Sequence, residues 1–442
     1  MRSGMDISPL AQSQASAGPP GVPSGPTTVP HPLTLGAGRS DPFAQYPINM
    51  DIRTHELFDH LHGNTCPMFN TLRKIGFFRA ILDEAAFSQI LSTSSSHMMS
   101  LRDPEKAENP EAIVLSSEAI RSINRRITDP VLGTSDGVIF AIISFACHAV
   151  MFNDVQGTLT HFNGLEAIIH RRGGLDALGS NPVLRIVLFW IDVNTAFLHD
   201  RCPRFPAPED ILPKANIEVL ALHSPHPMLE ACIDEQVVSV MSELLVLNQL
   251  ILSELAVRDM WDDGVFAGLH IVPIMSKLLC IRQEPCEHGP VFARQKACRI
   301  GALLYLAAIR RSFGVHLAPD IHIPKLKHAI TTWVELNMDG TNPLILWLLV
   351  IGGAQSLGHQ DNGWFVSATV NIIVRLQLSA WEELMNSVRS VLWVEGILQV
   401  ECSEFHRKIS SEATNNEIAQ VNSQFISRND SFTANLPPKA HS

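Results

Sequence analysis

Apolar residues recur with the spacing of an α-helix along most of this chain, and this feature restricts its fold more than any other. Two segments show the i, i+3/i+4, i+7 pattern most clearly: Ala119, Ile120, Ile123 and Ile127, and then Leu159, Phe162, Leu165 and Ile169. We find no alternating strand pattern flanked by hairpin turns in the sequence. The pattern therefore predicts an all-α protein.

Residues that suit helix ends stand at the edges of several of these segments. Arg171 and Arg172 precede Gly173 and Gly174, and this order is typical of a helix C-terminus, because basic side chains favour that end and glycine adopts the left-handed conformation. Asn followed by Pro predicts a helix start at 181–182 and again at 342–343. Further helices are expected over 344–356, 364–376 and 379 to about 405.

The composition changes near both ends of the chain. Residues 1–47 hold nine of the 28 prolines, and Ser, Gly and Thr fill most of the rest. Such a segment buries too little apolar surface to offset its ordering entropy, so we expect a disordered leader. Residues 409–442 are also polar, and we expect a flexible tail. Residues 48–408 are predicted to form a single large multi-helix domain.

The overall composition excludes several classes of protein. Hydrophobic residues make up 46% of the chain and charged residues 17%, which is typical of a globular protein. The net charge of −11 disfavours specific DNA binding by this chain alone, because the phosphate backbone needs a basic face. The first residues lack the apolar core of a signal peptide. The apolar stretch 138–152 is shorter than the ~20 residues of a membrane span, so no membrane association is expected.

The eight cysteines are scattered and include no C-x₂-C pair. Their spacing matches no zinc module, and a chain of this length does not need disulfides to fold. We therefore expect free, mostly buried thiols in a reducing compartment, with no metal and no cofactor.

Two short motifs suggest chemistry, and each has a simpler explanation. Residues 133–137 match G-x-S-x-G, but no convincing strand precedes them, so Thr134 or Ser135 is expected to cap the next helix. His55, Asp59 and His62 share one helix face that could hold a metal, although H-E-x-x-H is missed by one position. We expect a solvated helix there, and we predict no catalytic, metal-binding or DNA-binding residue.

A series of longer motifs follows in a distinctive order. The run 161–175 (HFNGLEAIIHRRGGL) leads into 184–192 (LRIVLFWID) and 201–206 (RCPRFP), and a second block comprises 343–354, 364–365, 379–383 and 391–393. This set resembles the fungal-specific transcription factor domain, and the resemblance covers most of residues 50–405. That domain is the helical regulatory region that follows a DNA-binding zinc cluster in many fungal regulators.

The resemblance implies an all-α transcriptional regulator in the nucleus and not an enzyme. The six closely spaced cysteines of the Zn₂Cys₆ cluster are missing here. Either the cluster was lost from this chain, or the gene model starts too late, or the protein acts through partners, which would be the transcription machinery or a DNA-binding regulator. The resemblance leaves open whether the chain forms a homodimer and whether it binds a small-molecule effector. The motif residues, with a structural role or a role in an effector pocket, are Arg171, Gly173, Gly174, Trp190, Asp192, Arg204, Phe205, Pro206, Trp347, Gly352, Trp364 and Trp381.

The tryptophans and one aspartate of these motifs lead to specific expectations. We expect Trp190, Trp347, Trp364, Trp381 and Trp393 to be mostly buried and to line a tightly packed core or a cavity, where an effector would first be sought. Asp192 lies in an apolar helix, where a buried carboxylate needs a partner. We favour Arg204 in the following loop over Arg185 or Arg171, and an exposed Asp192 is the alternative.

Two other functional classes remain open. One is an α-helical metal-dependent or hydrolytic enzyme built around the histidines or Ser135, and the other is a non-catalytic scaffold. Metal analysis of the purified protein separates the enzyme from the regulator.

Overall fold

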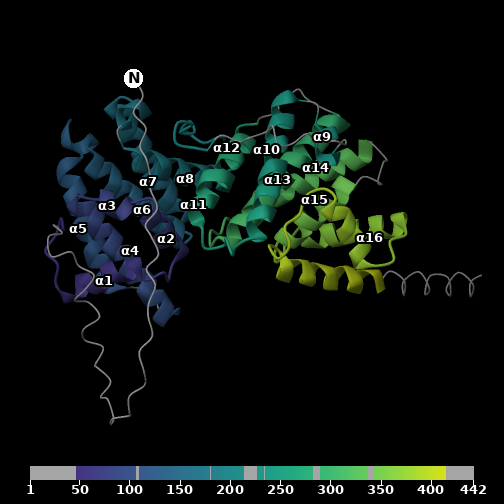
Figure 1. The fold of residues 1–442 in the computed structure, drawn as a ribbon, viewed down its shortest axis with the longest axis horizontal. Helices are drawn as coiled ribbons and strands as arrows, with labels where there is room; N and C mark the ends of the chain where they lie inside the picture. Colours follow the sequence, from purple (N-terminus) through teal and green to yellow (C-terminus); the bar gives the residue numbers. More distant parts are fainter. Residues whose placement is uncertain are drawn as a thin grey trace, which may run out of the picture. The chain divides into compact units, whose positions relative to one another are not determined.

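The fold is that of a computed structural model, which describes residues 46–414 apart from 106–108, 180, 214–225, 233, 282–288 and 337–342 (Figure 1). All regular secondary structure in these ranges is helical, so the all-α prediction is confirmed. Most of the predicted leader and tail, 1–47 and 409–442, lies outside the described residues. Residues 409–414 continue a helix that begins at residue 399.

The first group of helices packs around α6. This helix contacts α4, α5, α7 and α8, and it is buried along nearly its whole length. The elements of the group are α1 (Ile52–His62), α2 (Pro67–Lys74), α3 (Phe77–Ala80), α4 (Glu84–Arg102), α5 (Pro110–Arg126), η2 (Leu132–Thr134), α6 (Asp136–Met151), α7 (Val155–Arg172), η3 (Leu175–Leu178) and α8 (Pro182–Leu198).

The second group packs around α15, whose residues 344–355 are all buried. This helix contacts α13, α14, α16 and α17. The elements of the group are α9 (Pro227–Glu230), α10 (Glu235–Leu255), α11 (Gly264–Phe266), η5 (Ala267–Ile271), α12 (Val272–Cys280), α13 (Pro290–Ser312), α14 (His322–Leu336), α15 (Pro343–Gln355), α16 (Asn362–Leu376), α17 (Trp381–Arg389) and the last helix, 399–414.

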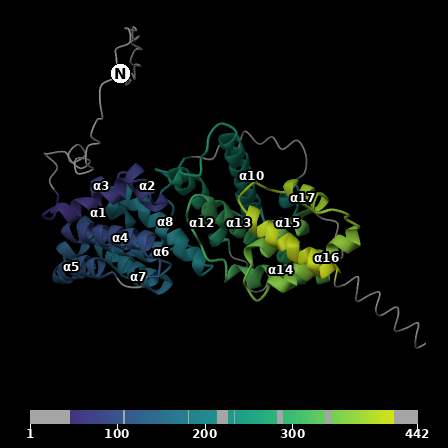
Figure 2. The ribbon, with the colours of Figure 1, turned by 90° about the horizontal axis from the view of Figure 1, so that it is seen from below.

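The segment α11–η5–α12 joins the two groups. Helix α12 contacts α8 of the first group and α10 and α13 of the second, and η5 contacts α13 (Figure 2). The five residues of η5 are π-helical, and Pro273 follows directly in the first turn of α12. Proline lacks the N–H that a carbonyl in the preceding turn would need. A π-helical turn before a proline is a frequent way to accommodate it, and such turns often lie at functional sites.

The helix ends predicted from the sequence are confirmed where the structure describes them. Helix α7 ends at Gly173, which has a left-handed φ of 108°. Helix α8 starts after Asn181, whose side-chain oxygen accepts a hydrogen bond from the N–H of Leu184. Helix α15 starts at Pro343, and the expected cap at residue 342 lies outside the described residues.

The expected single helix from 379 to about 405 is wrong. Helix α17 ends at Arg389, and helical structure resumes only at residue 399. Gly396 has a φ of 90°, which places it in the left-handed region that a helix interior excludes. The non-helical segment is also buried, and the carbonyl of Leu392 accepts a hydrogen bond from the indole of Trp347 at 2.6 Å. Packing against α15 thus overrides the local helical pattern.

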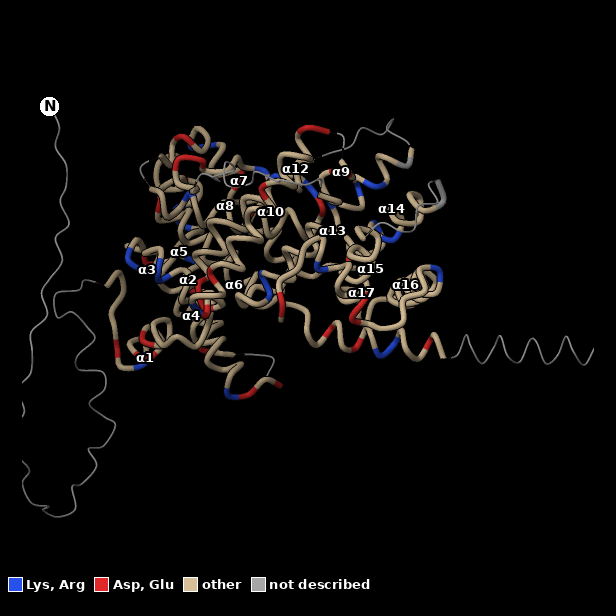
Figure 3. The backbone as a smooth tube through the Cα atoms, turned by 45° about the vertical axis from the view of Figure 1, so that its right-hand side comes forward, with Lys and Arg blue, Asp and Glu red and all other residues tan. Residues whose placement is uncertain are grey.

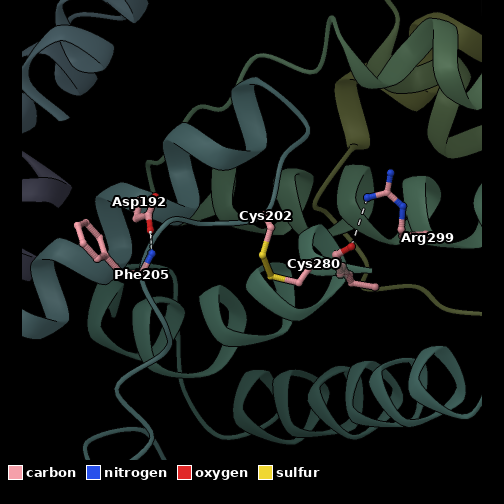
Figure 4. Close-up of a disulfide and its surroundings, with 6 residues drawn as sticks. Asp192, Cys202, Phe205, Cys280 and Arg299 are labelled. Carbon is pink, nitrogen blue, oxygen red and sulfur yellow. Dashed lines mark hydrogen bonds between the residues drawn. A yellow bond between two sulfur atoms is a disulfide. The ribbon is translucent and has the colours of Figure 1, made fainter. Parts of the chain in front are cut away.

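The expectation of free thiols is wrong for two cysteines. Cys202 and Cys280 form a disulfide that joins the loop after α8 to the end of α12 across a sequence separation of 78 residues (Figure 4). Both residues are exposed, and their spacing carries no local signal of pairing. Cys286 lies outside the described residues, and the remaining cysteines are free and buried: Cys66, Cys147, Cys232, Cys298 and Cys402.

Among the described helices, α10 is long and apolar enough by length and composition to cross a membrane. Half of that apolar stretch is buried inside the fold. The core helix of a globular domain has the same character.

Candidate functional site

The motif residues from the sequence do not meet at one place. Arg171, Gly173 and Gly174 end α7, Trp190 and Asp192 lie on α8, and Arg204, Phe205 and Pro206 belong to the loop after α8. The others lie in the second group, on α15 (Trp347 and Gly352), α16 (Trp364) and α17 (Trp381). The tryptophan prediction holds for Trp190, Trp347 and Trp393, which are buried. Trp364 and Trp381 are less enclosed, with intermediate exposure at the edge of the fold.

The two half-buried tryptophans stack on polar side chains. Lys327 lies 5.9 Å from the ring centroid of Trp364, and the ring of His406 stacks on Trp381 at 4.6 Å. A cation or an imidazole can stack on an aromatic ring while its own polar atoms stay in contact with water. These rings therefore cover the edge of the second group instead of filling its core.

Asp192 is fully buried, as expected, but its predicted partner is wrong. Its Oδ2 accepts a hydrogen bond from the backbone N–H of Phe205 at 2.7 Å (Figure 4). Its Oδ1 has no hydrogen-bond partner. Burial raises the pKa of Asp192 to about 6, and the N–H of Phe205 offsets this only in part. Asp192 therefore fixes the loop through the backbone and not through a guanidinium.

The arginine side chains considered as partners of Asp192 bind elsewhere. Arg204 pairs with Glu166, and its Nη2 donates to Asn163 at 2.6 Å, so it joins the loop to α7. Arg185 forms a two-pronged ion pair with Asp210. Arg171 donates to backbone carbonyls of the α5–α6 connection.

Trp190 fixes α8 against the π-helical turn. Its indole Nε1 donates to the carbonyl of Gly268 at 2.8 Å. In a π-helical pattern that carbonyl would accept from residue 273, which is a proline without an N–H. A Cβ on residue 268 would lie 2.3 Å from Cζ2 of Trp190. Glycine is thus required for the close approach of the two elements.

A pocket of about 200 Å³ lies beside this contact. Its walls come from α2, α6 and α8 of the first group and from η5, α12 and α13 of the second. Apolar side chains such as Val187, Ile191 and Phe313 form most of the lining. The Cys147 thiol also lines it, and burial raises the pKa of this thiol to about 12, so it stays neutral.

An outer pocket of about 550 Å³ adjoins the inner one. The two share Val150, Asn153, Asn194 and His316 in their linings. His316 and Asn153 are exposed, so the outer pocket connects the inner one to solvent. An apolar space with a few polar groups and an entrance is typical of a small-molecule site.

One charged side chain, Arg310 of α13, lines the inner pocket. It is 4% exposed, and its Nη1 donates to Oδ1 of Asn194 at 2.5 Å and lies 3.9 Å from the sulfur of Met275. Its Nε has no hydrogen-bond partner. Burial lowers the pKa of Arg310 to about 10, so the guanidinium stays protonated at neutral pH.

A second buried arginine on the same helix is neutralised by carboxylate. Arg299, which is 7% exposed, lies 3.1 Å from Oδ1 of Asp200, and Figure 4 shows it close to the disulfide. Lys325 adds a 2.6 Å contact to the same carboxylate. Burial alone would raise the pKa of Asp200, but Arg299 and Lys325 outweigh it and hold the pKa well below its usual range.

Neither the His55–His62 motif nor the Ser135 motif forms a group of side chains arranged for catalysis among the described residues. Nδ1 of His55 and Nδ1 of His62 contact the backbone carbonyls of Asp51 and Phe58 at 2.8 and 3.0 Å. No group of three or more His, Cys, Asp or Glu within the described ranges is placed to hold a metal. Ser135 occupies the cap position of α6, as expected, but its hydroxyl donates to the carbonyl of Leu132 and accepts no cap hydrogen bond.

The sequence interpretation missed Arg310, Asn194 and Gly268. Arg310 and Arg311 lie in the last turn of α13, where the helix dipole alone explains basic residues. A signal was available, because Arg310 falls seven residues after Leu303, on the apolar face of α13. The role of Gly268 depends on a partner in α8, 78 residues earlier.

Comparison with known proteins agrees with the resemblance seen in the sequence. The profile described as "Fungal specific transcription factor domain" matches residues 56–249, from within α1 to within α10. No curated protein and no solved structure gives a significant match. The match includes Trp190, Asp192 and Asn194 but ends before Gly268 and Arg310. Residues 56–249 of this chain are therefore similar to the fungal-specific transcription factor domain.

Proposed function

We propose that this chain is a nuclear, non-catalytic regulator of fungal transcription that responds to a small-molecule effector bound in the inner pocket. The observation that carries the proposal is the position of this pocket between the two helix groups. A ligand that contacts α8 on one side and η5 and α13 on the other would bind with different affinity as these elements shift. Effector binding would thereby change the surface that the domain offers to partners.

The charge distribution supports action through partner proteins instead of direct reading of DNA. The chain carries a net charge of −11, and Lys and Arg positions are dispersed among Asp and Glu along the described helices (Figure 3). Specific DNA recognition needs a basic face as well as groups that reach the bases. The proposed partners are the transcription machinery or a DNA-binding regulator.

A reporter assay tests the regulatory part of the proposal. The full chain is fused to a heterologous DNA-binding module and expressed in a fungal cell with a matching reporter gene. We expect reporter transcription to differ from that given by the module alone. Equal transcription from the fusion and the module would contradict a regulatory role.

A pair of valine variants tests whether the pocket controls this output. Val150→Phe fills the space shared by both pockets, whereas Val114→Phe adds the same volume at an exposed position on α5. We expect the first variant to change reporter transcription and the second to leave it unchanged, with both folded by circular dichroism. The same output from both variants would contradict effector control.

A further inference from the structure

Arg310 lines the inner pocket, and part of its guanidinium has no hydrogen-bond partner. Its only polar contacts in the described chain, to Asn194 and to the sulfur of Met275, both use Nη1. Nε and Nη2 are left without a hydrogen bond. A buried guanidinium without an anion is costly, since removing a charge from water is offset only by pairing and full hydrogen bonding.

The same protein shows how the edge of an arginine binds a carboxylate. In Arg53, Nε and Nη2 donate to the two carboxylate oxygens of Glu111 at 2.7 and 2.8 Å. Such a two-pronged pair is strong and geometrically specific. The guanidinium of Arg310 has no such partner among the described residues, so a carboxylate in the pocket would supply the missing anion.

The surroundings of Arg310 restrict the rest of the ligand. Among the residues that the structure describes, no carboxylate side chain lines the inner pocket, and its other walls are mainly apolar or neutral. One guanidinium balances one negative charge, whereas a phosphate group carries more charge and more acceptor oxygens than this lining can satisfy. Because Arg310 is 4% exposed, the acid must enter the pocket as a free small molecule.

We propose that the inner pocket binds an apolar monocarboxylate, with the carboxylate on the guanidinium of Arg310 and the apolar part between Trp190 and Phe313. This inference rests on the proposed function, because it names the chemical class of the effector. Asn194 holds Nη1 and so orients the guanidinium. The ligand supplies the negative charge that Asp200 supplies to Arg299.

Binding of matched probes to the purified full chain tests the ligand class. The probes are straight-chain acids from butanoate to decanoate, each beside its primary amide, measured by isothermal titration calorimetry. At least one acid is expected to bind about tenfold or more tighter than its amide, because only the acid pairs with the guanidinium. Equal binding of every acid and its amide, or no binding by any acid, would overturn the ligand class.

Variants of Arg310 test whether this side chain causes the tighter binding of the acid than of its amide. Arg310→Met is expected to remove the preference for the acid and leave amide binding unchanged, and it should fold, since it removes an unpaired buried charge. Arg310→Lys keeps the charge but loses the planar guanidinium, so part of the preference for the acid should remain. Arg294→Met is the matched control on α13, because Arg294 binds backbone carbonyls outside the pocket. A preference that survives Arg310→Met would refute the assignment.

The two proposals can fail separately. If acids bind through Arg310 while the reporter fusion equals the DNA-binding module alone, the ligand class stands and the regulatory function is wrong. If Val150→Phe changes the reporter while no acid binds better than its amide, the function stands and the ligand class is wrong. Displacement of a bound acid by an equal concentration of inorganic phosphate would also overturn the class.

Discussion

The indole ring of Trp190 lies against the Cα of Gly268, and its N–H donates to the carbonyl oxygen of that same glycine. This contact joins α8 of the first group to the π-helical turn η5 of the second. The ring leaves no room for a side chain at residue 268, since a Cβ would lie 2.3 Å from Cζ2.

Gly268→Ala is expected to destabilise the protein by about 1–3 kcal/mol, because the added methyl group displaces the ring of Trp190. Denaturant unfolding followed by circular dichroism measures the change in the free energy of unfolding. Gly164→Ala in α7 is the matched control, because a Cβ there meets no atom within 4 Å. That control should be neutral or stabilising by up to about 1 kcal/mol, from helix propensity alone. Equal effects of the two substitutions would disprove the tight contact.

Asp192 should make stability fall as the pH rises. Its pKa is raised to about 6 in the folded protein, so its protonated form favours folding below the unfolded pKa of about 3.9. That contribution is lost as the pH rises through 6, and it amounts to about 3 kcal/mol for a shift of this size. Asp192→Asn removes the titration, so the variant should gain stability relative to the wild type between pH 4 and pH 7.

Unfolding curves at several pH values measure this difference. Asp210→Asn is the control, because its ion pair with Arg185 lowers the pKa of that exposed carboxyl. The contribution of that pair is present above the unfolded pKa of about 3.9, so the difference in stability between the wild type and this control should stay nearly constant between pH 4 and pH 7. A difference between wild type and Asp192→Asn that stays constant with pH would contradict the raised pKa.

Asp200→Asn should be strongly destabilising, by about 3–5 kcal/mol, because it leaves the buried guanidinium of Arg299 without its anion. The lowered pKa gives a pH dependence opposite to that of Asp192: the contribution of Asp200 is present above its unfolded pKa and is lost as the pH falls. Thermal and urea unfolding at neutral and acidic pH test both parts. A loss of less than about 0.5 kcal/mol at neutral pH, the size of a surface change, would reject the buried pair.

Reduction of the disulfide between Cys202 and Cys280 should lower the free energy of unfolding by about 2–4 kcal/mol, because the bond closes a long loop in the unfolded chain. Urea unfolding with and without dithiothreitol measures the loss. The double variant Cys202→Ser/Cys280→Ser should match the reduced protein and should no longer respond to the reductant. An unchanged midpoint for the wild type on reduction would show that the bond is absent or energetically neutral.

The sequence predicted features of the fold that depend on neighbours along the chain. The cap at Asn181 and the left-handed Gly173 follow from local chemistry, and both are observed. The break at Gly396 was missed, because a buried contact with α15 outweighs the helical pattern of the surrounding residues.

The candidate site is formed by contacts between residues far apart in the sequence, and no local sequence pattern predicts such contacts. Cys202 and Cys280 are exposed cysteines with no distinguishing neighbours, and only the packing of α12 beside α8 brings them together. The sequence correctly predicted that Asp192 is buried and that it binds the loop after α8. The donor is the backbone N–H of Phe205, however, and not the side chain of Arg204. Arg310 stands in the last turn of α13, where the helix dipole alone explains a basic residue, so its burial was not predicted.

The π-helical turn of η5 makes the length of the chain at this point as important as the identity of its residues. Residues 264–280 form one uninterrupted helical run, and each residue turns the following ones by about 100° around the axis. Deleting one residue from 267–271 would let an α-helix form there, but it would rotate α12 away from α8 and draw Cys280 out of reach of Cys202. Substitutions in this turn should therefore be tolerated more readily than any insertion or deletion, and a chain that keeps this pocket should keep the spacing between Asp263 and Pro273.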